Sequence, residues 1–167
     1  MHIENATIAD IDLIFDFYDK AIAYQKTVFH KQWEFFERSM VEQEIQEKKQ
    51  WKIIIDGQVA CIFALAYEDE ELWKEKSKQP AIYIHRIVTH PDFRGNNFVE
   101  KIIVWSRQFC AENNKAFIRL DTWADNPRLV NYYIKCGFNY LGDAQIGAET
   151  NLPAHYKGAL ALFEIKL

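Results

Sequence analysis

The second half of the chain alternates strand-like and helix-like segments, and this order restricts the fold more than any other feature of the sequence. The run Ala81–Thr89 is rich in β-branched and aromatic residues, and an amphipathic helix is predicted over residues 97–113. A second strand is predicted over residues 116–122, and Asn126–Pro127 then opens another helix, with Asn as N-cap and Pro at the first helical position. Strands that are separated by helices pair in parallel, so this half of the chain predicts an α/β sheet.

The first half of the chain adds helices and hairpin strands. Thr7 and Asp10 have the spacing of a capping box, and a hairpin is predicted around Asp56–Gly57. Residues 68–79 are mostly charged and are expected to form a solvated hairpin tip, in which Trp73 is a candidate subunit contact. The remaining expected elements are strands over residues 2–6, 51–56, 58–67, 138–141 and 160–167, and helices over residues 8–22 and 32–49.

The resulting element order is β-αα-β-β-β-α-β-α-β-β, in which short turns and helical crossovers both occur. The expected fold class is therefore α/β, with a mixed central sheet in one layer and helices on both faces. The chain has 167 residues, of which 49% are hydrophobic, so it can bury a core and fits one domain over residues 1–167.

Charge and cysteine usage exclude several classes of protein. The formal net charge of −4 does not suggest a basic face for nucleic acid. Cys61, Cys110 and Cys136 are widely spaced and form no C-x-x-C pair, so neither a metal site nor a disulfide framework is expected. Residues 1–15 lack the basic start of a signal peptide, and no apolar run approaches the roughly 20 residues that span a bilayer. We therefore expect a cytoplasmic protein without nucleic-acid or membrane partners.

Residues 84–99 join a strand, a turn and the start of a helix, and they carry the first functional signal. The turn contains Arg94 and Gly95, and the helix that follows places several unpaired backbone N–H groups at one point. Such a helix N-terminus binds phosphate groups. The helix dipole adds only about 0.3–1 kcal/mol per charge at an exposed site, so the N–H hydrogen bonds must supply most of the affinity.

Residues 125–138 carry the second functional signal. Asn126 caps the helix, and Tyr133 lies two turns into it. Lys135 and then Gly137–Phe138 mark the end of the helix. This segment therefore holds a phenol at a fixed position on a short, capped helix.

Together, the two segments make the chain resemble the acetyltransferases of the GNAT family. The acetyl-CoA segment of that family reads L-x-V-x-P-x-x-R-G-x-G-x-G/A, and its later segment reads N-x-x-A-x-x-x-Y-x-K-x-G-F. The positions that fall on these patterns are Ile87, Thr89, Pro91, Arg94 and Gly95 in the first, and Asn126, Tyr133, Lys135, Gly137 and Phe138 in the second. The element order is also similar, so the resemblance covers nearly the whole chain and implies the GNAT fold, an acyl-CoA N-acyltransferase fold with a partly splayed central sheet.

The resemblance implies an acetyl-CoA-dependent N-acetyltransferase, with acetyl-CoA as cosubstrate and no metal. The acetyl group would pass directly, in a ternary complex, to a primary amine of a small molecule or peptide. Tyr133 would protonate the leaving thiolate, and a backbone N–H at Val88 or its neighbours would hold the developing oxyanion. Dimers are common in the family, so a homodimer is a further expectation. The residues implied to bind the cofactor are Ile87, Val88, Thr89, Arg94, Gly95, Asn96, Asn97, Phe98, Val99, Asn126 and Tyr133.

Several roles stay open at this level. His85 lies in the strand that lines the site in GNAT proteins, and it is either the general base or a strand histidine satisfied by hydrogen bonds. Asp121, at the end of the neighbouring strand, either binds a cationic substrate or has a capping or turn role. Residues 144–158, which include His155 and Tyr156, form either a substrate lid or a surface loop.

Two residues depart from the family pattern in the first segment. Asn97 stands where the family has its second loop glycine, and Val99 stands at the next Gly/Ala position. Asn tolerates left-handed backbone conformations, whereas the β-branched Val99 is expected to crowd the pyrophosphate. These departures motivate an alternative hypothesis, a catalytically weak GNAT-fold binding or regulatory module with impaired CoA binding.

Overall fold

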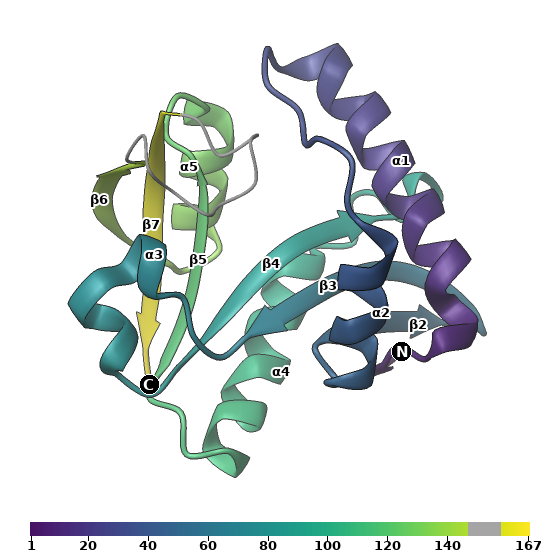
Figure 1. The fold of residues 1–167 in the computed structure, drawn as a ribbon, viewed down its shortest axis with the longest axis horizontal. Helices are drawn as coiled ribbons and strands as arrows, with labels where there is room; N and C mark the ends of the chain where they lie inside the picture. The colour runs from purple at the N-terminus through teal and green to yellow at the C-terminus, as the bar shows by residue number, and fades with distance from the viewer. Residues whose placement is uncertain (147–157) are drawn as a thin grey trace. The chain divides into compact units, whose positions relative to one another are not determined.

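The computed structural model describes residues 1–146 and 158–167, which form two compact units. The first unit holds residues 1–65 and 86–98, and the second holds residues 66–85 and the described part of 99–167. Figure 1 colours the chain by residue number from the N-terminus to the C-terminus. Within these described residues, no helix has both the length and the apolar character that crossing a membrane requires.

The strands are β1 His2–Asn5, β2 Gln50–Ile55, β3 Gln58–Ala66, β4 Ala81–Thr89, β5 Phe117–Trp123, β6 Asn139–Gln145 and β7 Ala159–Lys166. The helices are α1 Ile11–Val28, α2 Arg38–Gln46, α3 Glu70–Trp73, α4 Phe98–Glu112 and α5 Pro127–Lys135, with short 3-10 helices η1 Ile8–Asp10, η2 Lys74–Lys78 and η3 Pro91–Phe93. Apart from the short α3 and the 3-10 helices, this is the predicted order of elements.

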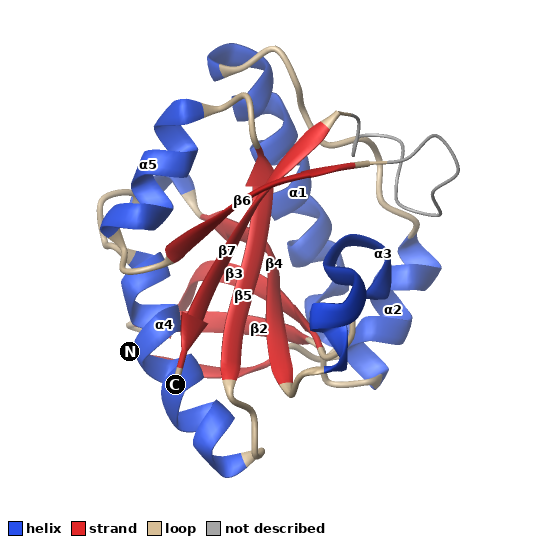
Figure 2. Ribbon diagram, turned by 90° about the vertical axis from the view of Figure 1, so that its left-hand side faces the viewer, coloured by secondary structure: helices blue, strands red, loops and turns tan. Residues whose placement is uncertain are grey.

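The strands pair as the connections between them predict. In the first unit, β1, β2 and β3 are antiparallel neighbours. In the second unit, β4 pairs in parallel with β5, and β7 lies antiparallel between β5 and β6 (Figure 2). Parallel and antiparallel pairs both occur among the described strands, which confirms the predicted α/β fold class with a mixed sheet.

The core of the first unit forms around α1. Its buried side chains, Ile11, Ile14, Phe17 and Tyr18, recur at helical spacing and make one apolar stripe. The predicted capping box between Thr7 and Asp10 is present and fixes the start of this helical segment at η1. The hydrophobic periodicity therefore positions α1 as the sequence indicates.

The helix predicted over residues 32–49 is wrong at its start, because α2 covers only Arg38–Gln46. The Trp33 backbone N–H donates to Gln25 Oε1 at 2.7 Å instead of to a helical carbonyl. The rings of Trp33 and Phe36 pack against Tyr18, with centroid distances of 6.3 and 4.8 Å. The apolar side chains before α2 thus pack into the core from a backbone that is not helical.

A buried arginine organises the second unit. Arg119 on β5 is 0% exposed, and its guanidinium is paired with Glu164 on β7 at 2.8 Å. Its remaining contacts are Nη1 to the Lys76 carbonyl at 2.7 Å, Nη1 to the Tyr83 hydroxyl at 3.0 Å, Nη2 to Gln79 Oε1, and a position over the Trp73 ring at 4.8 Å. A buried charge needs such compensation, so Arg119 draws residues 73–79 onto the sheet.

This contact overturns the predicted solvated tip over residues 68–79. The segment forms α3 and η2, and Trp73 is 2% exposed. Trp73 packs against Tyr83 with a centroid distance of 5.6 Å. The expectation that Trp73 marks a subunit contact is therefore wrong, because its ring is part of the core.

Candidate active site

The backbone of the loop before α4 has the conformation that the motif predicts. After β4 ends at Thr89, the chain makes the short η3 turn, and α4 begins at Phe98. Gly95 and Asn97 between them have φ of +84° and +53°. A left-handed backbone is open to Gly and is tolerated by Asn, so Asn97 fits the position of the family glycine. The loop thus leads several backbone N–H groups to the N-terminus of α4.

Two side chains of this loop make contacts that fix their positions. The Arg94 guanidinium lies over the Tyr24 ring at 4.2 Å, and Asn96 Nδ2 donates to the Phe93 carbonyl at 2.8 Å. Val99, the first residue of the second unit after the loop, is 7% exposed. The Val99 side chain is therefore buried at the start of α4, and whether it crowds a bound pyrophosphate stays a prediction.

Arg86 interrupts the regular conformation of β4. Its φ is +51°, in the left-handed region that non-Gly residues rarely adopt. Its Nη2 donates to Glu44 Oε1 at 2.5 Å, and its guanidinium lies over the Tyr18 and Phe36 rings at 5.7 and 5.3 Å. These contacts in the first unit compensate the strained backbone.

The parallel ladder between β4 and β5 is short. It runs through three residue pairs and ends at Tyr83 with Arg119. His85 and Asp121 each lie two residues further along their strands, so they project on the same face as that last pair. Two polar side chains therefore face each other directly beyond the end of the ladder.

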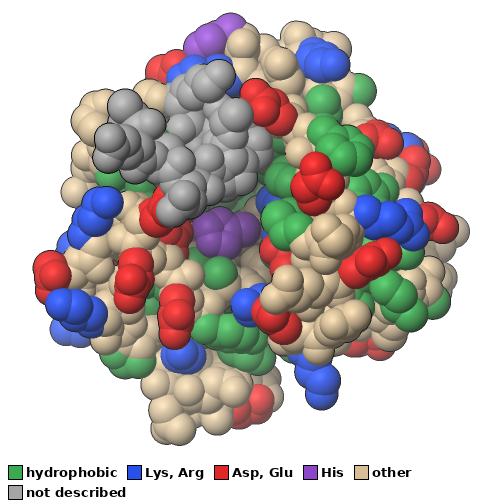
Figure 3. Space-filling model, in the orientation of Figure 1, with side chains coloured by type: hydrophobic (Ala, Val, Ile, Leu, Met, Phe, Trp, Pro, Cys, Tyr) green, Lys and Arg blue, Asp and Glu red, His purple; other side chains and the backbone are tan. Residues whose placement is uncertain are grey.

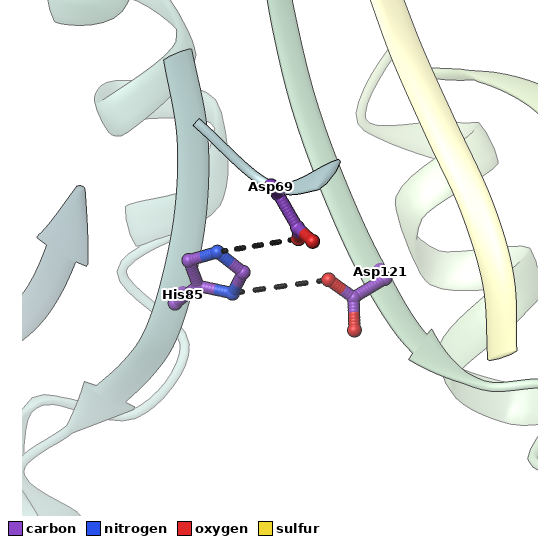
Figure 4. A group of neighbouring side chains, drawn as sticks. All are labelled: Asp69, His85 and Asp121. Atoms are coloured by element: carbon purple, nitrogen blue, oxygen red, sulfur yellow. Dashed lines mark ion pairs between the residues drawn. The ribbon is translucent and has the colours of Figure 1, made fainter. Parts of the chain in front are cut away.

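Asp69 joins these two residues in a cluster (Figure 4). His85 Nε2 lies 4.0 Å from Asp69 Oδ2, and His85 Nδ1 lies 3.8 Å from Asp121 Oδ1. The other Asp69 oxygen, Oδ1, accepts from the Leu72 backbone N–H at 3.2 Å as the N-cap of α3. The side chain of His85 is 21% exposed, and that of Asp121 is 4% exposed. The imidazole is thus the most accessible member of a largely buried group.

Burial shifts the protonation of both carboxyl groups. Burial first, and the negative charge of Asp69 second, raise the pKa of Asp121 to about 7. Burial also raises the pKa of Asp69, against the lowering effect of the Leu72 N–H. The Asp121 carboxyl therefore changes its protonation near neutral pH.

The helix α5 packs Tyr133 against β7. Asn126 Oδ1 accepts from the Leu129 N–H at 3.2 Å, which confirms the predicted N-cap. The Tyr133 ring packs 5.5 Å from that of Phe163 on β7, whose register partner on β5 is Leu120. Successive strand residues alternate faces, so Tyr133 approaches β5 from the face opposite to the cluster, one position away from Asp121.

Comparison with known proteins identifies the family. The sequence profile of the acetyltransferase (GNAT) family matches residues 22–138. The chain belongs to the GNAT family. This membership confirms the resemblance drawn from the two motifs, and with it the predicted enzyme class, an acetyltransferase.

GNAT relatives are found by sequence and by structure. An uncharacterized N-acetyltransferase, YesJ of Bacillus subtilis (strain 168), is 28% identical over 74 residues, which cover 44% of this chain and 41% of YesJ. A GNAT acetyltransferase from Listeria monocytogenes 4b F2365 has a TM-score of 0.80 at 23% identity, covering 99% of this chain and 94% of that one. The yncA protein of Salmonella typhimurium, solved with its cofactor acetyl-CoA, has a TM-score of 0.70 at 13% identity, covering 100% and 94%. The structural matches show the GNAT fold.

The GNAT site residues expected from the sequence fall in both units. Those from Ile87 to Phe98 belong to the first unit, and His85, Val99, Asn126 and Tyr133 belong to the second. Within the second unit, the structure brings His85 beside Asp121. His155 and Tyr156 lie outside the described residues. On the face drawn in Figure 3, acidic and basic side chains are interspersed.

Asp69 is a site residue of this GNAT chain that the sequence interpretation missed. The charged residues around it predict a solvated tip, although an Asp followed by two glutamates is a common start of a helix. That local signal predicts the N-cap of α3. It does not predict the cluster, because the approach of Asp69 to β4 and β5 depends on the burial of Arg119 far along the chain.

Proposed function

We propose that the chain is a single-domain, acetyl-CoA-dependent N-acetyltransferase that acetylates a primary amine of a small molecule or peptide. The observation that carries this proposal is the end of the β4–β5 ladder, where His85 faces Asp121 on one side of β5. Tyr133 packs one position away on the other side. A proton acceptor and a proton donor on opposite sides of one strand support direct transfer in a ternary complex.

The loop before α4 is suited to the pyrophosphate of acetyl-CoA, which supplies the acyl thioester. Gly95 and Asn97 are left-handed, and the helix N-terminus presents its N–H groups. In this proposal the backbone from Ile87 to Thr89 and residues 94–98 contact the cofactor. Val99 and Asn126 contribute from the start of α4 and of α5.

His85 is proposed as the general base. An alkyl amine has a pKa near 10.4, so only about one molecule in 2,500 is neutral at pH 7, a deficit of roughly 4.6 kcal/mol. His85 is the most exposed member of its cluster, and the two carboxylates stabilise the imidazolium that forms when it takes a proton. This arrangement reduces the deficit at the place where the amine must react.

The remaining roles follow the family pattern. Tyr133 is proposed to protonate the leaving thiolate, and the Val88 backbone N–H is proposed to hold the developing oxyanion. The Tyr133 ring is fixed by Phe163 and by Phe138, with centroid distances of 5.5 and 6.1 Å. A phenol held by two rings keeps a constant position, as a proton donor requires.

The test combines binding and turnover. Calorimetry with acetyl-CoA, desulfo-CoA and dephospho-CoA measures the affinity and its dependence on the phosphates, and CoA release with a panel of amines measures transfer. Micromolar, phosphate-dependent binding with amine-dependent CoA release supports the proposal. Binding without turnover on any amine, or absence of detectable acetyl-CoA binding, would favour the alternative, a catalytically weak GNAT-fold binding or regulatory module with impaired CoA binding.

Location and assembly are separate proposals. All three cysteines, Cys61, Cys110 and Cys136, are free thiols, which suits a reducing cytoplasm. Burial raises the pKa of the Cys61 thiol to about 12, so this thiol is inert. A homodimer is proposed because dimers are common in the family, and light scattering of the purified protein tests it.

A further inference from the structure

Helix α1 contacts the loop before α4 at two points that lie two helical turns apart. The ring of Phe17 lies 5.6 Å from that of His90, and the Arg94 Cζ atom lies 4.2 Å from the centre of the Tyr24 ring. Residues seven positions apart share one face of a helix and lie about 10.5 Å apart along its axis. All four residues belong to the first unit. One face of α1 therefore supports this loop from its start to Arg94.

The two contacts differ in burial. Phe17 is 1% exposed and is part of the core of the first unit, so its contact with His90 helps to fold the loop onto α1. Tyr24 is 41% exposed, so its ring adds little to that core. Leu and Gln form helices more readily than Tyr at an exposed position. The ring contact that Tyr24 does make is with Arg94.

The positive charge of Arg94 has no carboxylate partner. Among the residues that the structure describes, the Arg94 side chain forms no salt bridge or hydrogen bond. The acidic residue closest to it in the sequence, Asp92, places its Oδ2 atom 3.7 Å from His90 Nδ1. An aromatic face attracts a guanidinium and leaves its N–H donors for other acceptors. Tyr24 therefore fixes the cation while its five N–H donors stay available to an anion.

The residues that follow Arg94 have a backbone suited to an anion. Gly95 and Asn97 both have left-handed φ values, +84° and +53°. Successive N–H groups in such conformations form a concave site for phosphate groups. A guanidinium beside this backbone adds charge-assisted hydrogen bonds, which are about twice as strong as neutral ones and reach two phosphate oxygens at once. The position of the Arg94 side chain therefore affects how tightly this loop holds a pyrophosphate.

We propose that Tyr24 is a positioning residue for the cofactor, because its ring holds the Arg94 guanidinium ready to donate to the pyrophosphate of acetyl-CoA. The inference rests on the proposed acetyltransferase function, and it adds a residue of α1 that lies outside both sequence motifs. An arginine that moves freely in solvent loses rotamer freedom when it binds a phosphate. Arg94 has already lost part of this freedom against Tyr24, so the cofactor binds more tightly.

The test measures acetyl-CoA binding to the full chain by calorimetry, in a double-mutant cycle. Tyr24→Leu removes the aromatic face and keeps a good helix former, whereas Tyr24→Phe keeps the ring. Arg94→Gln removes the positive charge, and Tyr24→Leu is also made in the Arg94→Gln background. Phe35→Leu, which removes an aromatic ring that is 75% exposed in the same unit, is the matched control.

Tyr24→Leu should weaken acetyl-CoA binding by about two- to fivefold, the size of a cation–π interaction at an exposed site, and Arg94→Gln by at least about tenfold. Tyr24→Phe and Phe35→Leu should bind as well as wild type. In the Arg94→Gln background, Tyr24→Leu should cause no further loss, because no cation is left to position. The loss caused by Tyr24→Leu should be equal for dephospho-CoA, which keeps the pyrophosphate.

An equal loss from Tyr24→Leu in both backgrounds would show that Tyr24 acts on the fold and not through Arg94, and it would overturn the inference. Unchanged affinity of Tyr24→Leu, or a loss with acetyl-CoA that is absent with dephospho-CoA, would overturn it as well. These outcomes leave the acetyltransferase function intact, since the wild-type protein still binds the cofactor. Absence of acetyl-CoA binding by the wild-type protein would instead count against that function.

Discussion

The Asp121 carboxylate lies 3.8 Å from His85 Nδ1, and both residues stand two positions beyond the last pair of the β4–β5 ladder. A continuing ladder would fill this space with backbone hydrogen bonds. Here Arg86, with its left-handed φ, follows His85 directly. The His85 and Asp121 side chains thus lie just beyond the point where the backbone pairing of β4 with β5 ends.

Replacement of Asp121 by Asn should stabilise the protein in a pH-dependent way. The pKa of Asp121 is about 7 in the folded chain and near its ordinary value of 3.8 when unfolded, so the folded state holds the extra proton between these values. Stability therefore falls as pH rises through this window. Urea unfolding should show Asp121→Asn about 2–4 kcal/mol more stable than wild type at pH 8, and nearly equal to it at pH 4.

The groups that face Asp121 do not reverse the direction of this pH dependence of stability. Asp69 adds a like charge, and Leu162 on β7 is apolar. Asp16→Asn changes an exposed residue, so its stability should differ from that of wild type by the same small amount at both pH values. A gain of stability for Asp121→Asn that is equal at pH 4 and pH 8 would contradict the raised pKa of the Asp121 carboxyl.

Tyr133→Phe should lower turnover by about 10²-fold or more, because the leaving thiolate loses its proton donor. The phenyl ring keeps the packing against Phe163, so the acetyl-CoA dissociation constant and the melting temperature should stay within error. Steady-state kinetics and calorimetry measure the two effects separately. Tyr132→Phe, on the exposed neighbouring residue, should change neither. An equal loss of affinity and turnover at Tyr133 would argue against a proton donor.

Asn97→Val should weaken acetyl-CoA binding, because a β-branched residue is strained by about 1–3 kcal/mol at a φ of +53°. Asn97→Gly should bind as well as wild type. Asn114 has the same φ of +53° after the end of α4, so Asn114→Val is a control with equal strain away from the loop. Loss of affinity in both Val variants would mean that general destabilisation, and not the loop, is responsible.

Val99→Gly should destabilise the protein by about 2–3 kcal/mol without tightening acetyl-CoA binding. The side chain is 7% exposed, so its removal loses buried apolar contacts and adds a glycine to the first turn of α4. Thermal unfolding and calorimetry measure the two quantities. Tighter binding of acetyl-CoA by the variant would show that the side chain does reach the pyrophosphate.

Local signals predicted the elements and the loop well. The capping box at Thr7 and Asp10 and the N-cap at Asn126 were both readable, because caps depend on residues only three positions apart. That Asn97 can adopt a left-handed backbone conformation follows equally from a single residue. The order of strands and helices followed from such signals in series, and it was sufficient to identify the fold.

Contacts between distant segments defeated the same reasoning. Residues 68–79 were expected in solvent because they are charged, whereas Arg119, some 40 residues later, buries Trp73. The place where the β4–β5 ladder ends is likewise a matter of register between strands. The sequence therefore offered His85 and Asp121 as separate candidates, and it could not bring Asp69 to them.

The buried guanidinium of Arg119 has a consequence for engineering acceptor preference. A library that randomises the connection between β3 and β4 would vary Asp69 and its surroundings, and it would also remove Trp73 and Gln79, which close around Arg119. Most clones would then misfold before their chemistry could be screened. Holding those two positions and Arg119 constant, while varying Glu70, Glu71 and Lys74, should leave a foldable set in which specificity can be selected.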